Sequence, residues 1–477
     1  MKIVFLFFLL NLFFFHQHKN FILAAAEQAS ATATVALWDV PAWSGTLNAG
    51  FQKLRIAFKF KKDTTGKLTA LMVSIDQGMS ELVADKVRFE KNRLELVFTK
   101  KKGKYTGELK NNPARVEGYW QQSLYKLPLN LKPTLKDIRP ARPQEPKPPF
   151  PYKTEEVKVK NGEDNITLAG TLTIPAQKGK VPGVVLITGS GSQDRDETIF
   201  SHRPFFILAD HLARAGIASL RLDDRGVGKS EGDPKKATTF DFVKDIRAAY
   251  LFFKKRAEIE QKQIGLIGHS EGGLIAPILA ATQPDISFIV LLAGTAFPGD
   301  EILFQQNRDI MRQAGLSEER IAKKIKRLKR AFFYIVYERD AKLAHKKLLQ
   351  LYKTNYEGTS LPEARSKKVV ATLLSPWFKT FLSLDPAPYL AKVNCPVLSL
   401  IGSKDLQVNA RINLGEMRRI FQKKPEVSFT AYELEGLNHL FQKCQTGLVQ
   451  EYGKIEQTFS PVALKKITAW IKKIPKE

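Results

Sequence analysis

The chain has 477 residues, a formal net charge of +27 and two cysteines, Cys395 and Cys444. This length favours two folded units, and so few cysteines, without a spaced cluster of cysteine and histidine, exclude a disulfide scaffold and a zinc site. The basic residues are scattered and accompany no nucleic-acid-binding motif, so we expect a solvated surface that attracts anionic surfaces, and no nucleic-acid partner. We also expect no cofactor, and the cysteines either pair or remain as two buried thiols.

The first 26 residues have the pattern of a secretory signal peptide. Lys2 precedes a mostly apolar run of thirteen residues, 3–15, and Ala24, Ala25 and Ala26 supply small residues near a cleavage point. Because this run is short for a membrane span, we expect an exported protein, periplasmic or extracellular, without stable membrane insertion after cleavage. The alternative is an uncleaved anchor, since residues 21–23 extend the apolar character.

Residues 35–132 are predicted to form a small antiparallel β domain. Apolar residues alternate with others along short runs such as Leu54, Ile56 and Phe58, and turn signals such as residues 63–66 separate the runs. This region contains no catalytic constellation that we identify. Residues 133–151 contain seven prolines, so we predict an extended linker there, without helix or β-ladder.

Residues 152–477 are predicted to form an α/β domain. After a hairpin, buried strand patterns alternate with helical patterns, and this order requires a mostly parallel sheet with helices on both faces. The predicted strands are residues 155–159, 166–174, 181–188, 217–222, 264–267, 286–292, 396–401 and 427–432. From about residue 297 to residue 389 the alternation gives way to long, lysine-rich helical patterns, which predict an inserted helical cap.

The sequence Gly268-His269-Ser270-Glu271-Gly272 lies between a predicted strand and a predicted helix. A nucleophile elbow needs this context, because its serine occupies a strained turn and the flanking glycines let neighbouring backbone approach. An ordinary tight turn is the alternative interpretation. The strand before the pentapeptide and the helix after it favour Ser270 as a nucleophile.

A serine nucleophile needs a general base, and in a chain with this elbow the acid and the histidine follow the serine. Only His345 and His439 lie downstream of Ser270. His345 falls in a basic, helical cap segment, whereas His439 follows a predicted strand, so we predict His439 as the base. Asp405 directly follows the strand at residues 396–401 and is the predicted acid; Asp385, in a proline-rich turn, is its rival.

The oxyanion formed during acyl transfer needs main-chain N–H donors. We expect one from Glu271, the residue after the nucleophile, and the other from Gly189 or Ser190 in the glycine-containing loop after the strand at residues 181–188. The alternative for this loop, a phosphate cradle, lacks the accompanying Gly-Lys-Ser/Thr or dinucleotide pattern.

Four stretches resemble secreted bacterial α/β-hydrolases of the esterase and serine-aminopeptidase-like branch, which often carry a small β domain in front. These stretches are the glycine loop with residues 193–197, Asp223 to Ser230, the elbow around Ser270, and residues 436–439. The second stretch is expected to be structural. Asp194 to Glu197 are predicted to form a salt-bridged loop rather than to line the site, and Thr188 departs from the histidine that relatives often have. Residues 375–378 either wall a substrate pocket or pack within the cap.

The main functional hypothesis is hydrolysis of a small-molecule carboxylic ester through an acyl-enzyme, with Ser270, His439 and Asp405 as the triad. Two alternatives remain. One is an aminopeptidase-like serine peptidase, since the same triad attacks amides. The other is a non-catalytic envelope-binding protein that uses the hydrolase fold as a scaffold.

Overall fold

The computed structural model describes residues 35–49, 52–75, 80–99, 102–122, 125–135, 141–177, 179–353 and 363–475. The chain forms two compact units that divide between Ala141 and Arg142. The predicted signal peptide, residues 1–26, lies outside the described residues. Across the described ranges, no helix has the length and apolar character to cross a membrane.

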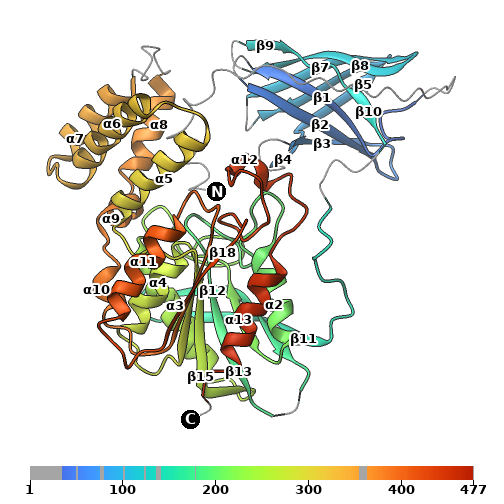
Figure 1. Cartoon of the computed structure of the whole chain (residues 1–477). Helices are drawn as coiled ribbons and strands as arrows, with labels where there is room; N and C mark the ends of the chain where they lie inside the picture. Colours follow the sequence, from blue (N-terminus) through green and yellow to red (C-terminus); the bar gives the residue numbers. More distant parts are fainter. Residues whose placement is uncertain are drawn as a thin grey trace. The chain divides into compact units, whose positions relative to one another are not determined.

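The N-terminal unit contains two five-stranded antiparallel sheets, coloured blue to cyan in Figure 1, with strand orders β10-β1-β2-β3-β4 and β5-β6-β7-β8-β9. The strands are β1 (Ala42–Ala49), β2 (Gln52–Lys62), β3 (Leu68–Ser74), β4 (Ser80–Val83), β5 (Lys86–Glu90), β6 (Arg93–Phe98), β7 (Gly103–Asn111), β8 (Ala114–Gln122), β9 (Tyr125–Pro128) and β10 (Lys132–Thr134). Both sheets contribute to one apolar core, in which the Phe58 ring lies 5.0 Å from the Tyr105 ring. The alternating pattern therefore buries one side of each sheet.

The β-ladder extends into the segment that the prolines predict to be an unpaired linker. β10 pairs with β1, and Pro133 lies opposite Trp43. The prediction is wrong at this point because β10 is an edge strand, and an edge strand can accommodate proline.

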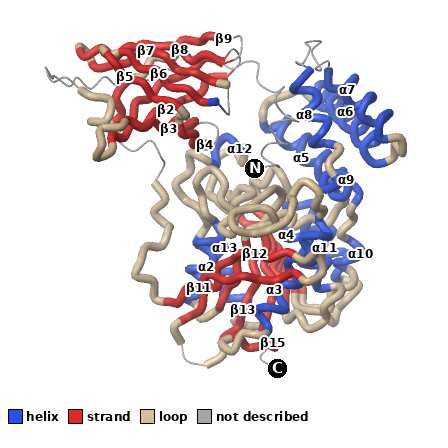
Figure 2. The backbone as a smooth tube through the Cα atoms, turned by 180° about the vertical axis from the view of Figure 1, so that it is seen from behind, coloured by secondary structure: helices blue, strands red, loops and turns tan. Residues whose placement is uncertain are grey.

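The C-terminal unit is built on an eight-stranded sheet with the order β11-β12-β14-β13-β15-β16-β17-β18. Figure 2 draws the strands of this sheet in red, with β11, β12, β13 and β15 labelled. The strands are β11 (Tyr152–Asn161), β12 (Ile166–Pro175), β13 (Val181–Ile187), β14 (Ala218–Leu222), β15 (Ile259–His269), β16 (Phe288–Leu292), β17 (Val397–Gly402) and β18 (Phe429–Leu434). β12 is antiparallel to both of its neighbours, and the strands from β14 to β18 run parallel. The carboxyl ends of β13, β15, β17 and β18 therefore meet at one edge.

Helices cover both faces of this sheet, as the continuous apolar strands require. α3 (Thr239–Lys254), α4 (Gly272–Ala280), α10 (Ala387–Leu390) and α11 (Ala410–Phe421) pack in one core with Val185, whereas α2 (Pro204–Arg214) and α13 (Pro461–Ile471) pack in the other with Val184. A further short helix, α12 (Val449–Tyr452), precedes α13. This arrangement confirms the predicted α/β-hydrolase fold.

The predicted cap lies between β16 and β17 and is helical. Its helices are α5 (Gly299–Gln313), α6 (Glu318–Val336), α7 (Ala341–Lys353), α8 (Glu363–Leu373) and α9 (Pro376–Ser383). Leu328, Phe332 and Ile335 lie on one side of α6 and pack with Phe378 of α9 in a core of the cap's own. Most lysines and arginines of α6 are exposed, whereas Arg327 turns toward α7 and donates to the Leu351 carbonyl oxygen.

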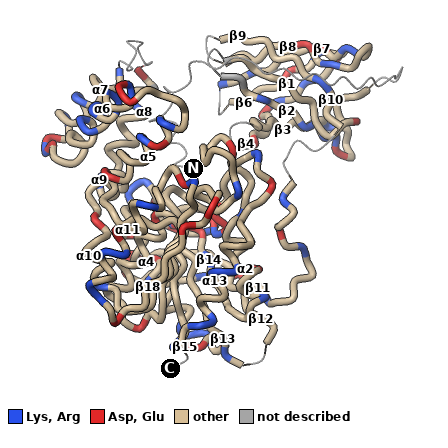
Figure 3. Tube along the Cα trace, viewed as in Figure 1, with Lys and Arg blue, Asp and Glu red and all other residues tan. Residues whose placement is uncertain are grey.

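Charged residues occur throughout both units, and Figure 3 shows lysine and arginine on cap helices as well as along the sheets. This distribution is the scattered one that the sequence predicts, and attraction to anionic surfaces stays a prediction. Cys395 and Cys444 are both unpaired, and burial raises the pKa of the Cys395 thiol to about 12.

Candidate active site

Ser270 lies in the turn between β15 and α4, with a backbone φ of +53°. A non-glycine residue in this left-handed region costs about 1 kcal/mol or more, and such strain is found at functional sites. Gly268 makes the turn possible, because a Cβ there would lie 2.0 Å from the Gly272 carbonyl oxygen. The Ser270 N–H donates to the Leu292 carbonyl at 2.8 Å, which fixes the turn against β16, and the residue itself is only half-buried.

Asp405 and His439 form a buried pair. His439 Nδ1 lies 2.8 Å from Asp405 Oδ2, while Asp405 Oδ1 accepts hydrogen bonds from the N–H groups of Gln407 and Val408. Asp405 is 3% exposed and His439 4%. Main-chain donors thus hold one carboxylate oxygen, Oδ1, while the other, Oδ2, accepts from His439 Nδ1. Nδ1 is therefore the protonated ring nitrogen, and Nε2 is left to accept a proton.

The loop that carries His439 is shaped by Asn438. Its side-chain oxygen accepts from the N–H groups of Leu440 and Gln442, and its amide nitrogen donates to the Gln442 side chain at 3.0 Å. Asn438 is fully buried. The asparagine therefore sets the main-chain path on both sides of the histidine.

The structure brings the three predicted triad residues to the same edge of the sheet. Ser270 follows β15, Asp405 follows β17 and His439 follows β18. Among the described residues no hydrogen bond joins Ser270 Oγ to His439 Nε2. Such bonds are often long without substrate, so their absence does not remove a candidate base.

The two residues predicted as alternative oxyanion donors differ in availability. The Gly189 N–H donates to Glu197 Oε1 at 2.6 Å and is therefore occupied. Within the described chain no acceptor binds the Ser190 N–H, and the buried Ser190 hydroxyl also has no hydrogen-bond partner. A Cβ on Gly189 would lie 3.2 Å from Ser270 Cβ, so this loop lies directly against the elbow.

Asp224 ties the same loop to β14. Its Oδ1 accepts from the Thr188 hydroxyl at 2.7 Å, and its Oδ2 accepts from the Gln193 N–H at 2.8 Å. Burial raises the pKa of Asp224 to about 8, against the hydrogen bonds from Gln193 and Thr188, which lower it. Asp224 therefore keeps its proton to a higher pH than an ordinary aspartate does.

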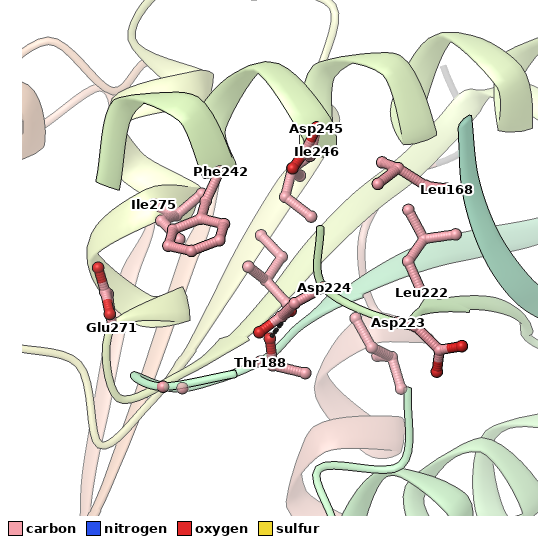
Figure 4. Close-up of a pocket in the computed structure, with 14 residues that line it drawn as sticks. Leu168, Thr188, Leu222, Asp223, Asp224, Phe242, Asp245, Ile246, Glu271 and Ile275 are labelled. Carbon is pink, nitrogen blue, oxygen red and sulfur yellow. Dashed lines mark hydrogen bonds between the residues drawn. The ribbon is translucent and has the colours of Figure 1, made fainter. Parts of the chain in front are cut away.

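A small pocket lies beside these residues. Apolar side chains, among them Phe242 and Ile275, line it together with the buried Asp224 and Glu271, and Gly189 borders it. Figure 4 shows Thr188 and Asp224 facing each other, with Glu271 on the elbow side. The pocket thus adjoins both the oxyanion loop and the residue after the nucleophile.

Glu197 and His269 form a second buried acid–histidine pair, which the sequence analysis did not identify. His269 Nδ1 lies 2.8 Å from Glu197 Oε1, and His269 Nε2 lies 3.0 Å from the His439 carbonyl oxygen. Although burial alone lowers the pKa of His269, Glu197 and the His439 carbonyl outweigh it and hold that pKa above its usual value. The only sequence signal was the position of His269 beside the nucleophile.

The loop before Glu197 is salt-bridged, as predicted. Arg195 binds Asp223 at 2.8 Å and Glu156 at 2.8 Å, and Asp196 pairs with Arg203 and Arg221. Glu197 itself differs from these residues, because its 3% exposed side chain turns inward to the site. The prediction therefore holds for the loop but missed the role of its last residue.

The cap contacts the elbow through Trp377. The indole N–H donates to Glu271 Oε1 at 2.8 Å and lies 3.1 Å from Oε2, and the Thr239 hydroxyl donates to the same carboxylate at 2.7 Å. Both Trp377 and Phe378 pack in the cap core, as one of the two expected roles requires, and Trp377 also reaches the residue after the nucleophile.

The rival residues lie elsewhere. His345 is on cap helix α7, and the exposed Asp385 accepts the Ala387 N–H at the start of α10, as a turn or helix-start residue would. Among the described residues, no group of three or more histidine, cysteine or acidic side chains is placed to hold a metal ion.

Comparisons with known proteins place these features in context. A family model described as serine aminopeptidase, S33, matches residues 202–441, half of the chain. Esterase EstD of Thermotoga maritima is 28% identical over 246 residues, which are 51% of this chain and 51% of EstD. An uncharacterized 31.7 kDa protein of Escherichia coli is 26% identical over 204 residues, 42% of this chain and 66% of that protein. The chain therefore spans about half to two thirds of the length of these relatives.

Two solved structures are similar at lower identity. The esterase Pf2001 of Pyrococcus furiosus is 17% identical with a TM-score of 0.42, over 70% of this chain and 98% of that one. Est1E from Butyrivibrio proteoclasticus, solved with ferulic acid bound, is 19% identical with a TM-score of 0.39, over 66% of this chain and 96% of its own.

Proposed function

Because the chain belongs to the serine aminopeptidase S33 family, we propose that it is a serine hydrolase that cleaves carboxylic esters. The observation that carries this proposal is the strained Ser270 at the sheet edge where the buried Asp405–His439 pair also lies. Since one fold hosts many functions, the proposal rests on these residues. The similarity to esterase EstD supports esters as the substrate class.

In the proposed reaction, His439 Nε2 takes the Ser270 Oγ proton as Oγ attacks the ester carbonyl carbon. The carbonyl π electrons move to the oxygen, giving a tetrahedral oxyanion. When this intermediate collapses, the C–O bond to the alcohol breaks and the alcohol leaves with the proton from His439. Water, deprotonated by His439, then hydrolyses the acyl–Ser270 ester and restores the enzyme.

For the oxyanion, we assign the N–H groups of Ser190 and Glu271. Gly189 is excluded from this role because its N–H donates to Glu197 at 2.6 Å. Ser190 is the next residue of the loop that lies against Ser270, and Glu271 directly follows the nucleophile. Removing one such donor from an oxyanion hole typically lowers kcat by about 10²–10³-fold.

The second candidate function is an aminopeptidase, which the description of the family model favours. The same triad attacks amides, and a peptidase of this kind needs an anionic group for the substrate's amino terminus. Glu271 lines the pocket beside the elbow, but its carboxylate already accepts from Trp377 and Thr239. Together with the similarity to esterase EstD, this leaves the ester hypothesis the better supported of the two.

The rates of hydrolysis of p-nitrophenyl esters of increasing acyl length and of aminoacyl p-nitroanilides distinguish the two functions. We expect the wild type to cleave the esters with the higher kcat/KM, and Ser270→Ala to lose this activity. A higher kcat/KM on the anilides would favour the peptidase. Unchanged ester hydrolysis by Ser270→Ala would overturn the role of Ser270.

A further inference from the structure

The Glu197–His269 pair lies where three parts of the site meet. Glu197 Oε1 accepts from Gly189 N–H at 2.6 Å, on the oxyanion loop, and from His269 Nδ1 at 2.8 Å, on the elbow. His269 Nε2 in turn lies 3.0 Å from the carbonyl oxygen of His439. One carboxylate and one imidazole therefore connect the oxyanion loop, the nucleophile's neighbour and the main chain of the predicted base.

The hydrogen-bond partners fix the protonation of His269. The His439 carbonyl oxygen can only accept, so His269 Nε2 donates to it, and with Glu197 as a carboxylate, whose Oε1 also accepts the Gly189 N–H, Nδ1 donates as well. His269 is thus an imidazolium paired with a carboxylate. Its pKa is held above the usual value in agreement with this geometry, although burial alone acts in the opposite direction.

The surroundings of the pair are buried and acidic. His269 is 6% exposed and Glu197 3%. The titratable groups that face or influence His269 are Glu197, Asp405 and His439, whose ring lies 4.8 Å from that of His269. A buried charge pair is costly to break by removing one partner, because the other charge is left without compensation.

Glu197 also has an unusual main-chain conformation, with φ +53°. A glutamate in this region has a steric cost that a glycine would not have. The turn is held by Asp194, whose carboxylate accepts the N–H groups of Asp196 and Thr198, and by the ion pairs of Arg195 and Asp196. The strained conformation and the contacts that hold the turn direct the Glu197 side chain inward, as a positioning role requires.

From these contacts we propose that Glu197 and His269 are positioning residues that hold the oxyanion loop and the His439 main chain in register with Ser270. The proposal rests on the proposed function, because the geometry that it maintains is that of the Ser270 reaction. Because Glu197 accepts the Gly189 N–H, Ser190 is left as the loop residue whose N–H donates to the oxyanion. Deprotonation of His269 would remove a donor from the pair, so these contacts weaken as pH rises through the raised pKa of His269.

The test compares Glu197→Gln with Glu197→Asp and with the control Glu156→Gln. Glutamine retains one acceptor but no charge, aspartate retains the charge, and Glu156 is an exposed ion-pair partner of Arg195 in the same loop network. We expect Glu197→Gln to lower kcat by about 10–100-fold with KM within about twofold. The alkaline limb of its kcat–pH profile should move to lower pH, Glu197→Asp should recover part of kcat, and Glu156→Gln should match the wild type.

The proposal is overturned if Glu197→Gln keeps the wild-type kcat and pH profile, or if it loses no more than Glu156→Gln. The rate of fluorophosphonate labelling of Ser270 provides the same comparison without a chosen ester. If wild-type labelling and hydrolysis do not depend on Ser270, the proposed function fails first. If they do depend on Ser270 and the Glu197 variants are unaffected, only the positioning role fails.

A second measurement applies even if Glu197→Gln does not fold. In ¹⁵N-histidine-labelled wild type, the His269 resonances, assigned with His269→Gln, should report two protonated nitrogens at about pH 6.5, where an ordinary histidine is half deprotonated. A neutral His269 at that pH would overturn the proposed ion pair.

Discussion

The two sides of Ser270 are built differently. On the histidine side, defined by Asp405 and His439, one carboxylate held by main-chain N–H groups orients one imidazole. The oxyanion side is defined by residues 188–197 with Asp224 and Glu271, and three buried carboxyl groups accept hydrogen bonds there. Glu197 accepts from a main-chain amide and the His269 imidazolium, and Asp224 accepts from a main-chain amide. Glu271 accepts from a hydroxyl and an indole. The histidine side must exchange a proton in every cycle, whereas the oxyanion side must stay fixed while charge develops. Substitutions on the first side should therefore act on the rate with little change in stability, whereas those on the second should change rigidity and pH dependence as well as the rate.

The largest effect is expected on the histidine side, from Asp405→Asn. The asparagine oxygen can still accept from Gln407 and Val408, but its NH₂ group would then face His439 Nδ1 and place the ring proton on Nε2. We expect kcat to fall by about 10⁴-fold, as for removal of a triad carboxylate elsewhere, with little change in unfolding free energy. Steady-state kinetics with urea unfolding measures both.

The matched control is Asp385→Asn, the rival acid in the sequence. Asp385 is exposed and only caps a short helix, so kcat should stay within about twofold of the wild type. If instead Asp385→Asn lost most of the activity and Asp405→Asn little, the histidine side would be wrongly assigned.

On the oxyanion side, Asp224→Asn should change the pH dependence of stability. The native pKa of Asp224, about 8, lies above its unfolded value, so wild-type stability is lost as pH rises from about 4 to about 8. Asparagine keeps the Gln193 bond and can donate to Thr188 without titrating. We expect the stability of the variant relative to the wild type to increase by up to about 1.4 kcal/mol per pH unit in this window and to level off above it.

Urea unfolding at several pH values between about 4.5 and about 9 measures this difference. Parallel curves for the two proteins would mean that Asp224 is ionised in the native state, and the oxyanion side would then carry more negative charge than we infer.

A smaller effect is expected from Trp377→Phe, which removes the cap's N–H donor to Glu271. Loss of a hydrogen bond to a charged group costs about 1.5–3 kcal/mol of unfolding free energy. The control Trp470→Phe removes a 3.3 Å bond to the neutral Thr430 hydroxyl and should cost about 0.5–1.5 kcal/mol. Equal losses in the two variants would indicate that the Trp377 contact is ordinary packing.

The smallest effect is expected from Ser190→Ala. The Ser190 hydroxyl is buried without a partner, and the proposed donor is the main-chain N–H, which alanine retains. We expect a turnover rate and an unfolding free energy close to those of the wild type. A roughly hundredfold slower turnover, the loss typical of a missing oxyanion donor, would show that the hydroxyl itself contributes to the oxyanion side.

The sequence predicts the histidine side better than the oxyanion side, for a physical reason. Ser270, Asp405 and His439 each follow a strand with a clear apolar pattern, and parallel strands present their carboxyl ends at one edge. The choice between Gly189 and Ser190 depends instead on a side chain eight residues away from Gly189, Glu197, which only the folded loop brings back.

The cap and linker show the same limit. Helical periodicity predicts the cap, but the approach of Trp377 to Glu271 depends on packing between helices that periodicity does not specify. Likewise, the prolines of residues 133–151 predict an extended chain, while the pairing of Pro133 depends on β10 being an edge strand.

The central claim, that Ser270 is the nucleophile of a serine hydrolase, is tested most directly by mass spectrometry after reaction with a fluorophosphonate. We predict one covalent adduct on the wild-type protein, located on the peptide that contains Ser270, and no adduct on Ser270→Ala. An adduct of equal yield on Ser270→Ala, or none on a folded wild-type protein, would contradict the account.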